Sequence, residues 1–127
     1  MGLKFHPNRG AILICDYSSG FRPPEMVKAR PVVIISPRHR RRPGLCTVVP
    51  LSSSEPEPIE PYHHELSVGA YPLAKGRMWA KCDMLATVSL DRLDRIKTGK
   101  RQYGTFKMPS ADMDAILAGV KAALGLH

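Results

Sequence analysis

The sequence predicts a mainly β protein, in which a small, strongly curved β-barrel carries one C-terminal α-helix. Three observations support this class. Short apolar runs rich in Val and Ile recur along the chain and are separated by turns rich in Gly, Pro and Ser. Only the last segment shows apolar residues at a helical period. The 127 residues show no internal repeat or domain boundary, so residues 1–127 are expected to form one domain.

The expected strands are bounded by turn residues. The first covers residues 10–17 and the second covers residues 31–36, where Pro31 suits the start of a strand because its φ is fixed and it has no N–H to donate. The third covers residues 45–51, with Pro50 marking an edge or a bulge. The remaining expected elements are a fourth strand at 62–68, a fifth within 75–89, and a short strand or helical turn at 91–96.

The helix is expected over residues 109–124. Ser110 is a suitable N-cap, because its hydroxyl can accept a hydrogen bond from a free backbone N–H. Asp112 and Asp114 fall in the first turns, where the helix dipole favours anions. Gly125 provides a C-terminal stop. The expected apolar face consists of Met113, Ile116, Leu117, Val120 and Leu124.

The chain is strongly basic. Lys plus Arg number 19 against 11 Asp plus Glu, which gives a formal charge of +8 and a pI near 9.8. Such an excess favours a polyanionic partner, which is a nucleic acid, an acidic protein segment or an anionic membrane surface; simple solubility is the alternative. No apolar run approaches the roughly 20 residues of a membrane span, and residues 1–9 lack the apolar core of a signal peptide. A cytoplasmic protein with no membrane segment is therefore expected.

The cysteines argue against a cross-linked or metal-bound fold. Cys15, Cys46 and Cys82 are odd in number, widely spaced and free of any Cys-x-x-Cys pair. We expect buried free thiols in a reducing compartment. His63 and His64 have no cysteine or carboxylate at ligand spacing, and adjacent strand residues face opposite ways, so neither a metal site nor an acid–base pair is expected there. No cofactor is expected.

Arg30 is the first candidate functional residue. It stands directly before the apolar run Pro-Val-Val-Ile-Ile, which is typical of a strand covered on both faces. A guanidinium held at the rim of a rigid strand is well placed for chemistry or anion recognition. The alternative is a solvated charge that merely ends a core strand.

Four segments, in this order along the chain, resemble the MazF/PemK toxins of bacterial type II toxin–antitoxin systems. Residues 10–17 look like the first strand of that family. Residues 30–37, Arg-Pro-Val-Val-Ile-Ile-Ser-Pro, and residues 47–52, Thr-Val-Val-Pro-Leu-Ser, are similar to its core. Lys81-Cys82-Asp83, followed by Thr87-Val88, is similar to its later Arg-Cys-Asp strand.

This resemblance extends from about residue 9 to residue 126 and carries several expectations. It implies an SH3-like barrel of the MazF/PemK/CcdB-like toxin fold and a homodimer. It also implies a metal-independent endoribonuclease that cuts single-stranded RNA and is held inactive by a cognate antitoxin. Two alternatives remain open: a non-catalytic SH3-like module that binds RNA or protein, and a toxin of the same fold that binds DNA gyrase.

RNA cleavage by the 2′-hydroxyl needs a base, a cation and an acid. The resemblance makes Arg30 the catalytic arginine, whose planar guanidinium grips phosphate with two hydrogen bonds. It aligns Ser52 with a catalytic threonine, whose hydroxyl can bind the scissile phosphate. It makes Glu25 a general base or an orienting partner of Arg30, and it makes Asp83 a second candidate base. Lys81 replaces the family's arginine; it keeps the positive charge but lacks the planar guanidinium that forms two parallel hydrogen bonds.

Each of these roles has a simpler alternative. The alternative for Ser52 is a loop serine that satisfies its own backbone, and Ser53 or Ser54 can take its place. Glu25 is otherwise an exposed loop carboxylate. Trp79 and Tyr62 can stack on bases, although Trp79 also suits the core. The residues expected to bind RNA are Arg22, Lys28, Ser53, Arg38, Arg40 and Arg41, with a solvated basic turn as the alternative for the last three.

Overall fold

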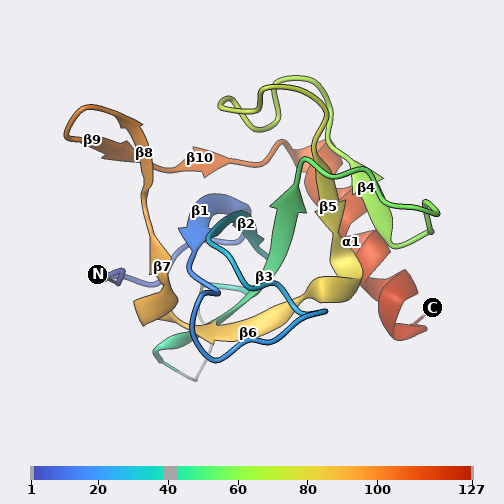
Figure 1. Ribbon diagram of the computed structural model, residues 1–127, viewed down its shortest axis with the longest axis horizontal. Coiled ribbons are helices and arrows are strands. Elements are labelled where there is room, and N and C mark those ends of the chain that lie inside the picture. The colour runs from blue at the N-terminus through green and yellow to red at the C-terminus, as the bar shows by residue number, and fades with distance from the viewer. Residues whose placement is uncertain (1, 39–42, 127) are drawn as a thin grey trace.

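The computed structural model describes residues 2–38 and 43–126, and it confirms a mainly β chain that ends in one α-helix (Figure 1). The first strands are β1 (Ala11–Cys15), β2 (Arg30–Ile34), β3 (Leu45–Ser52), β4 (His63–Glu65) and β5 (Trp79–Lys81). They are followed by the short 3₁₀ helix η1 (Cys82–Met84), β6 (Ala86–Ser89), the 3₁₀ helix η2 (Leu90–Arg92), β7 (Leu93–Asp94), β8 (Ile96–Gly99), β9 (Gln102–Gly104), β10 (Phe106–Lys107) and α1 (Ser110–Leu124).

Eight strands form one antiparallel sheet. Its main path runs β10, β1, β2, β3, β5 and β4, while β6 also pairs with β3 and β7 also pairs with β1. Within residues 2–38 and 43–126, β10 and β4 end this path without pairing with each other, so the sheet is open rather than a closed barrel. The fold class is as expected, and only the closure differs.

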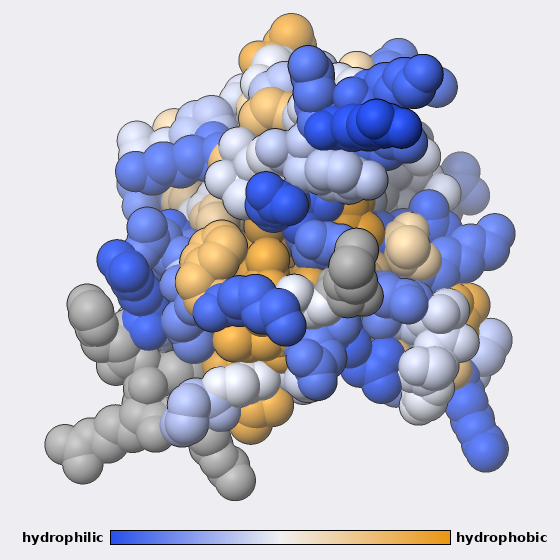
Figure 2. Space-filling model, turned by 90° about the vertical axis from the view of Figure 1, so that its left-hand side faces the viewer, coloured by the Kyte–Doolittle hydropathy of each residue, from blue (hydrophilic) through white to orange (hydrophobic). Residues whose placement is uncertain are grey.

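The β8–β9 hairpin is a separate two-stranded sheet. Figure 1 shows that it projects from one side of the molecule, between β7 and β10. Figure 2 views this side and shows a largely hydrophilic face around a smaller hydrophobic area. No strand was expected in residues 97–108, because the sequence there has no alternation of apolar and polar residues long enough to indicate one.

Strand β3 joins the two halves of the sheet. It pairs with β2 along one edge, and along its other edge it pairs first with β6, up to Val48, and then with β5, from Leu51. Val49 and Pro50 lie at the change of partner. A proline fits this position because it has no N–H to donate to a neighbouring strand. Pro50 therefore does not mark a free edge of the sheet. It marks the point along β3 where the partner strand changes from β6 to β5.

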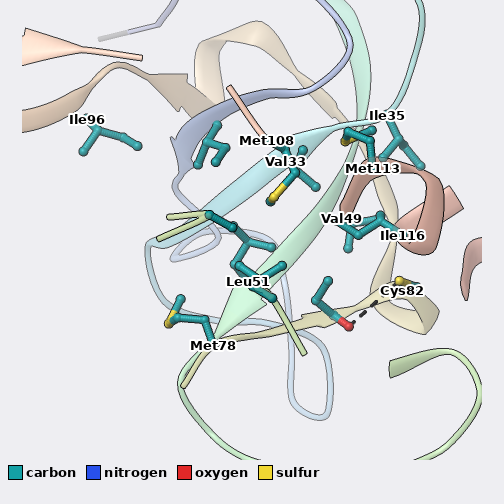
Figure 3. Packing of buried hydrophobic residues seen from close by; sticks show 14 residues of the cluster. Val33, Ile35, Val49, Leu51, Met78, Cys82, Ile96, Met108, Met113 and Ile116 are labelled. Carbon is teal, nitrogen blue, oxygen red and sulfur yellow. Dashed lines mark hydrogen bonds between the residues drawn. The ribbon is translucent and has the colours of Figure 1, made fainter. Parts of the chain in front are cut away.

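Apolar side chains cover both faces of the central strands, as the unbroken run in β2 predicts. On one face, Val33 and Val49 pack with Met113 and Ile116 of α1 (Figure 3). On the other face, Val32 lies in a second cluster. The second cluster also contains Leu3, Leu13, Cys15, Tyr17, Ile34, Cys46, Val48, Val88 and Leu93. Burial of each such aliphatic side chain contributes about 1.5–3 kcal/mol, so β2 and β3 are stabilised from both sides.

The helix has the expected length but a different beginning. Pro109 is the N-cap, and Ser110 is the first helical residue, without a capping side-chain hydrogen bond. Met113 and Ile116 are buried, whereas Leu124, at the end of the expected apolar face, is 54% exposed. Gly125 ends the helix with φ at +69°, a conformation that glycine adopts without strain.

Three expected elements differ in extent. The single strand expected within 75–89 is divided by η1 into β5 and β6, because η1 turns the chain toward α1. Residues 91–96 contain both alternatives, a 3₁₀ turn and a short strand. The strand expected at 62–68 is only β4, because Ser67 donates its backbone N–H and its hydroxyl to Asp112 instead of to a strand.

Candidate active site

Arg30 begins β2 and Ser52 ends β3, on adjacent antiparallel strands. The antiparallel register pairs Val32 with Pro50. Two residues further along each strand, the same register brings Arg30 opposite Ser52. Residues directly opposite in an antiparallel pair have Cβ atoms about 4.5–5.5 Å apart and lie on the same face. A cation and a hydroxyl are therefore placed on neighbouring strand ends at the rim of the sheet.

Within the part of the chain that the structure describes, the Arg30 guanidinium has no anionic partner. Its side chain is half-buried, and its Nε atom is buried without a hydrogen-bond partner among the residues that the structure describes. The ion pairs of these residues likewise do not include Arg30. A buried donor on a permanently charged group is costly to leave unpaired, so this arrangement suits an anionic ligand.

Ser52 belongs to the sheet rather than to the following loop. Its side chain is buried, and its hydroxyl accepts a hydrogen bond from the backbone N–H of Ser54 at 3.1 Å. This contact is the local backbone role foreseen as the simpler alternative. A hydroxyl has one proton to donate as well as two lone pairs, so the contact leaves the Ser52 proton available to a phosphate oxygen.

Glu25 and Asp83 come together across a cavity of about 300 Å³. Apolar side chains form most of its wall, namely Tyr17, Phe21, Pro24, Met26, Met84, Leu85 and Ala86. Several of these residues pack in the same cluster as Val32, whose side chain points to the same face of β2 as Arg30. The two carboxylates therefore lie on the face of the sheet that carries Arg30 and Ser52.

The loop before Arg30 is held by its own polar groups. Glu25 accepts a hydrogen bond from the backbone N–H of Arg22 at 2.9 Å, and its own N–H donates to the Arg22 carbonyl. Arg92 donates to the carbonyl of Asp16, and its guanidinium lies 4.7 Å from the ring centroid of Phe21. Glu25 thus closes a turn, and among the described residues no ion pair joins it to Arg30.

Strand β5 brings Lys81 to the same face. The register pairs Ser52 with Trp79 and Lys81 with His63, and residues two apart on a strand point the same way. Trp79 is almost fully buried, in agreement with a core role rather than base stacking. Lys81 is half-buried beside Asp83, the second residue of η1.

His63, which the sequence interpretation considered and set aside, lies close to the candidate residue Asp83. Its Nε2 atom lies 4.0 Å from Oδ1 of Asp83, and its Nδ1 atom accepts a hydrogen bond from the backbone N–H of Glu60. That acceptor role assigns the neutral ring proton to Nε2, which faces Asp83. His64 turns the other way, to Asp112, as alternation along a strand requires. The same alternation places the His63 side chain on the face of the sheet that carries Lys81.

The expected RNA-binding residues divide into three groups. Lys28 and Arg22 are exposed on the loop before Arg30, and Ser53 follows Ser52 directly. Arg38 is exposed, but it lies beyond the opposite end of β2 and is not brought to the site. Arg40 and Arg41 lie outside the described residues.

Ser53, which directly follows Ser52, lines a second cavity of about 370 Å³. Arg77 lies over the Trp79 ring, 5.1 Å from its centroid, at the edge of this cavity. Arg77 also binds Glu55 and Glu65, and these hydrogen bonds raise its pKa further, so it stays charged. A fixed cation therefore adjoins Ser53.

The cysteines are buried free thiols, as expected. Burial raises the pKa of Cys15 to about 11 and that of Cys82 to about 12, so neither thiol ionises near neutral pH. Among the described residues, no group of three or more His, Cys, Asp or Glu side chains is placed to hold a metal ion. In the same part of the chain no helix has the length and apolar character to span a membrane.

Comparisons with known proteins bear on the family and on the fold of this chain. A family model described as a PemK-like, MazF-like toxin of type II toxin–antitoxin systems matches residues 8–124. YifN, a putative uncharacterized protein of Escherichia coli strain K12, is 28% identical; the match covers 77% of this chain and 78% of YifN.

Two solved structures are similar in fold. MazF from Deinococcus radiodurans has a TM-score of 0.70 at 16% identity, covering 97% of this chain and 100% of its own. An endoribonuclease from Mycobacterial species, in complex with its cognate antitoxin, has a TM-score of 0.66 at 22% identity, covering 95% of this chain and 97% of its own.

Proposed function

This chain belongs to the PemK-like, MazF-like toxin family of type II toxin–antitoxin systems, and from this membership we propose that it is a metal-independent endoribonuclease of single-stranded RNA. The observation that carries the proposal is the Arg30 guanidinium at the start of β2, which has a buried N–H and, among the residues that the structure describes, no anionic partner. A phosphodiester supplies the missing anion.

The reaction follows from the positions of the side chains. Arg30 binds the non-bridging phosphate oxygens, whose negative charge grows as the fifth bond to phosphorus forms, and the Ser52 hydroxyl donates a hydrogen bond to one of them. A carboxylate, Asp83 or Glu25, accepts the proton of the 2′-hydroxyl as that oxygen attacks phosphorus. The bond to the 5′-oxygen breaks, and Lys81 supplies the proton that this oxygen needs. The products are a 2′,3′-cyclic phosphate and a 5′-hydroxyl.

Two protein partners belong to the proposal. A cognate antitoxin is expected to present an acidic segment that covers the basic surface of a chain with net charge +8. The Mycobacterial neighbour is itself described in complex with its antitoxin, which supports this expectation. We also propose a homodimer that acts in the cytoplasm. Arg22, Lys28, Ser53, Arg40 and Arg41 are proposed to bind the RNA, whereas Arg38, beyond the opposite end of β2, is left out of this set.

The test is cleavage of a single-stranded RNA by the purified protein in excess EDTA, with detection of 2′,3′-cyclic phosphate ends by mass spectrometry. Arg30→Ala removes a charge-stabilising donor, and its rate is expected to fall by about 10²–10³-fold. Lys121→Ala removes one exposed charge from α1 and serves as the control, with an unchanged rate. A fall of tenfold or less in Arg30→Ala contradicts the role of Arg30.

The same experiment separates the two alternatives. A protein that binds RNA tightly without cutting it is a non-catalytic module. A protein that neither binds nor cuts RNA, but binds DNA gyrase, is a gyrase-directed toxin of this fold. EDTA-sensitive cleavage contradicts metal independence while leaving endoribonuclease activity in place.

A further inference from the structure

The β8–β9 hairpin forms no part of the site described above. It is a two-stranded sheet of its own, rooted between β7 and β10, both of which pair with β1. Ile96 is buried at its base, where it packs in the cluster beneath the main sheet. Figure 1 shows that the rest of the hairpin extends away from the body of the molecule. A projecting hairpin whose base is packed in the core can contact a part of a ligand that the main sheet does not contact.

The hairpin concentrates positive charge. Residues 95–107 contain five of the chain's 19 Lys and Arg residues and no Asp or Glu, whereas an even spread puts about two there. All five are exposed: Arg95, Lys97, Lys100, Arg101 and Lys107. None of them takes part in an ion pair with another described residue. Figure 2 shows hydrophilic side chains projecting from the upper part of this face, where the hairpin lies. The charge is therefore free to meet a polyanion.

An aromatic ring lies among these cations. Tyr103 is 49% exposed, and the Arg95 guanidinium lies 5.6 Å from the centroid of its ring. Tyr103 pairs across the hairpin with Lys97. Proteins that bind single strands combine cations, which contact phosphates, with exposed rings, on which bases stack. An acidic peptide or an anionic lipid surface would use the cations but has no need of the ring.

The strand that leads into the hairpin lies in the same sheet as Arg30. Cys15 of β1 pairs with Arg30 on one side and with Leu93 of β7 on the other. The backbone of β7 is therefore two strand spacings, roughly 10 Å, from that of Arg30. From Leu93, opposite Cys15, to Asp94, opposite Ile14, β7 leads away from Arg30, so the hairpin that follows is placed to contact nucleotides away from the cleaved bond.

We propose that the β8–β9 hairpin is a second binding element for single-stranded RNA, which contacts phosphates through Lys97, Lys100 and Arg101 and stacks one base on Tyr103. The proposal rests on RNA as the ligand of the proposed function, but it concerns nucleotides outside the cleaved bond. The hairpin then lowers the KM for long RNA and leaves kcat unchanged.

Binding of a fluorescein-labelled, 2′-O-methyl oligoribonucleotide, which cannot be cleaved, tests the proposal by fluorescence anisotropy at several salt concentrations. The variant Lys97→Ala/Lys100→Ala/Arg101→Ala is expected to bind about tenfold more weakly or worse, and its log–log salt slope is expected to be smaller by about 2, for three lost phosphate contacts. Tyr103→Ala is expected to weaken binding by about 5- to 100-fold. Lys121→Ala, on α1, is the control and is expected to bind as the wild type does.

Two further titrations distinguish RNA from the other classes of ligand. The triple variant is also titrated with poly-glutamate and with vesicles of phosphatidylcholine and phosphatidylglycerol. Loss of binding to either, with RNA binding unchanged, overturns the proposal in favour of an acidic protein or a membrane surface. Unchanged RNA binding in both the triple variant and Tyr103→Ala also overturns it.

A last comparison separates this proposal from the proposed function. Arg30→Ala is expected to retain the contribution of the hairpin to binding of the uncleavable RNA. If the wild type does not cut RNA but the triple variant still loses affinity, only the proposed catalysis fails. If the wild type cuts RNA and the triple variant has the same KM for long RNA, only the hairpin proposal fails.

Discussion

The Nε2 atom of His64 lies 2.7 Å from Oδ1 of Asp112, and this contact joins β4 to the first turn of α1. The same carboxylate accepts hydrogen bonds from the backbone N–H and the hydroxyl of Ser67. Asp112 is 3% exposed, so its charge is compensated by these protein donors rather than by water. Asp112 therefore links α1 to β4 and to the residues that follow β4 through hydrogen bonds.

Asp112→Ala is expected to lower the free energy of unfolding by about 3 kcal/mol, because His64 and Ser67 lose a buried acceptor. Urea denaturation followed by circular dichroism measures the change. Asp114→Ala, at an exposed position of the same helix, is the control and is expected to cost less than about 1 kcal/mol. Equal losses in the two variants would mean that only the helix dipole matters.

The Asp112 carboxylate also predicts how stability depends on pH. Burial alone raises the pKa of this carboxyl, but the hydrogen bonds from Ser67 and His64 outweigh burial and lower it. The proton is thus held more tightly in the unfolded chain, so the stabilisation is fully present above about pH 4 and is lost as the pH falls through the folded pKa. Between pH 6 and pH 2, the wild type should lose more stability than Asp112→Ala does; parallel curves would contradict this.

Ser52→Ala is expected to reduce kcat for RNA cleavage by about 10²-fold, since it removes one donor to the phosphate. Ser52→Thr keeps the hydroxyl and is expected to stay within about threefold of the wild type, because threonine restricts only the side-chain rotamer. Initial rates at saturating RNA measure both. Ser54→Ala is the control, since only its backbone N–H contacts Ser52. If Ser52→Ala keeps more than a tenth of the rate, the hydroxyl is not a catalytic group.

Asp83→Asn is expected to lower kcat more than Glu25→Gln does. A general base contributes about 10²–10⁴-fold to the rate. Glu25 already accepts a hydrogen bond from the backbone N–H of Arg22, whereas Asp83 lies near His63, on the face of the sheet that carries Lys81. The measurement is the pH profile of kcat, in which loss of the base removes the acidic limb. A larger loss in Glu25→Gln would assign the base to the loop.

Gly119→Ala is expected to destabilise the protein by about 1–2 kcal/mol. A Cβ atom at this position lies 2.8 Å from the Cys82 Sγ atom, and the resulting overpacking exceeds the helix propensity gained, about 1 kcal/mol. Thermal unfolding measures the change. Adding Cys82→Ala removes the sulfur and is expected to recover at least about 0.5 kcal/mol in a double-mutant cycle. Additive losses would show that the close contact relaxes without strain.

The sequence was informative where local residue types decide the structure. The strands β1, β2 and β3 each hold a β-branched apolar run bounded by Gly or Pro, and such runs have few other stable arrangements. Gly125 likewise marks the end of α1. Arg30 was a candidate from its place before a core strand, whereas its catalytic role and the choice of Ser52 came from a family resemblance. The relative position of the two residues depends on the strand register, which spacing along the chain does not define.

Other features depend on contacts between distant residues. The partners of Asp112 are 45 and 48 residues away, so the first turn alone suggested only a dipole interaction. The division of residues 75–89 follows from the packing of η1 against α1, and no Gly or Pro marks the break at Cys82. The β8–β9 hairpin pairs only with itself and carries many charges, so it lacks the apolar periodicity from which strands are inferred.

The change of partner along β3 has a consequence for local opening. Because β3 lies between β2 on one edge and both β6 and β5 on the other, neither half of the sheet can detach without disturbing it. The amide protons of Val48 and Val49, buried in opposite clusters, are expected to exchange with deuterium only when the whole chain unfolds. Their exchange rates would then report the global stability of this protein directly.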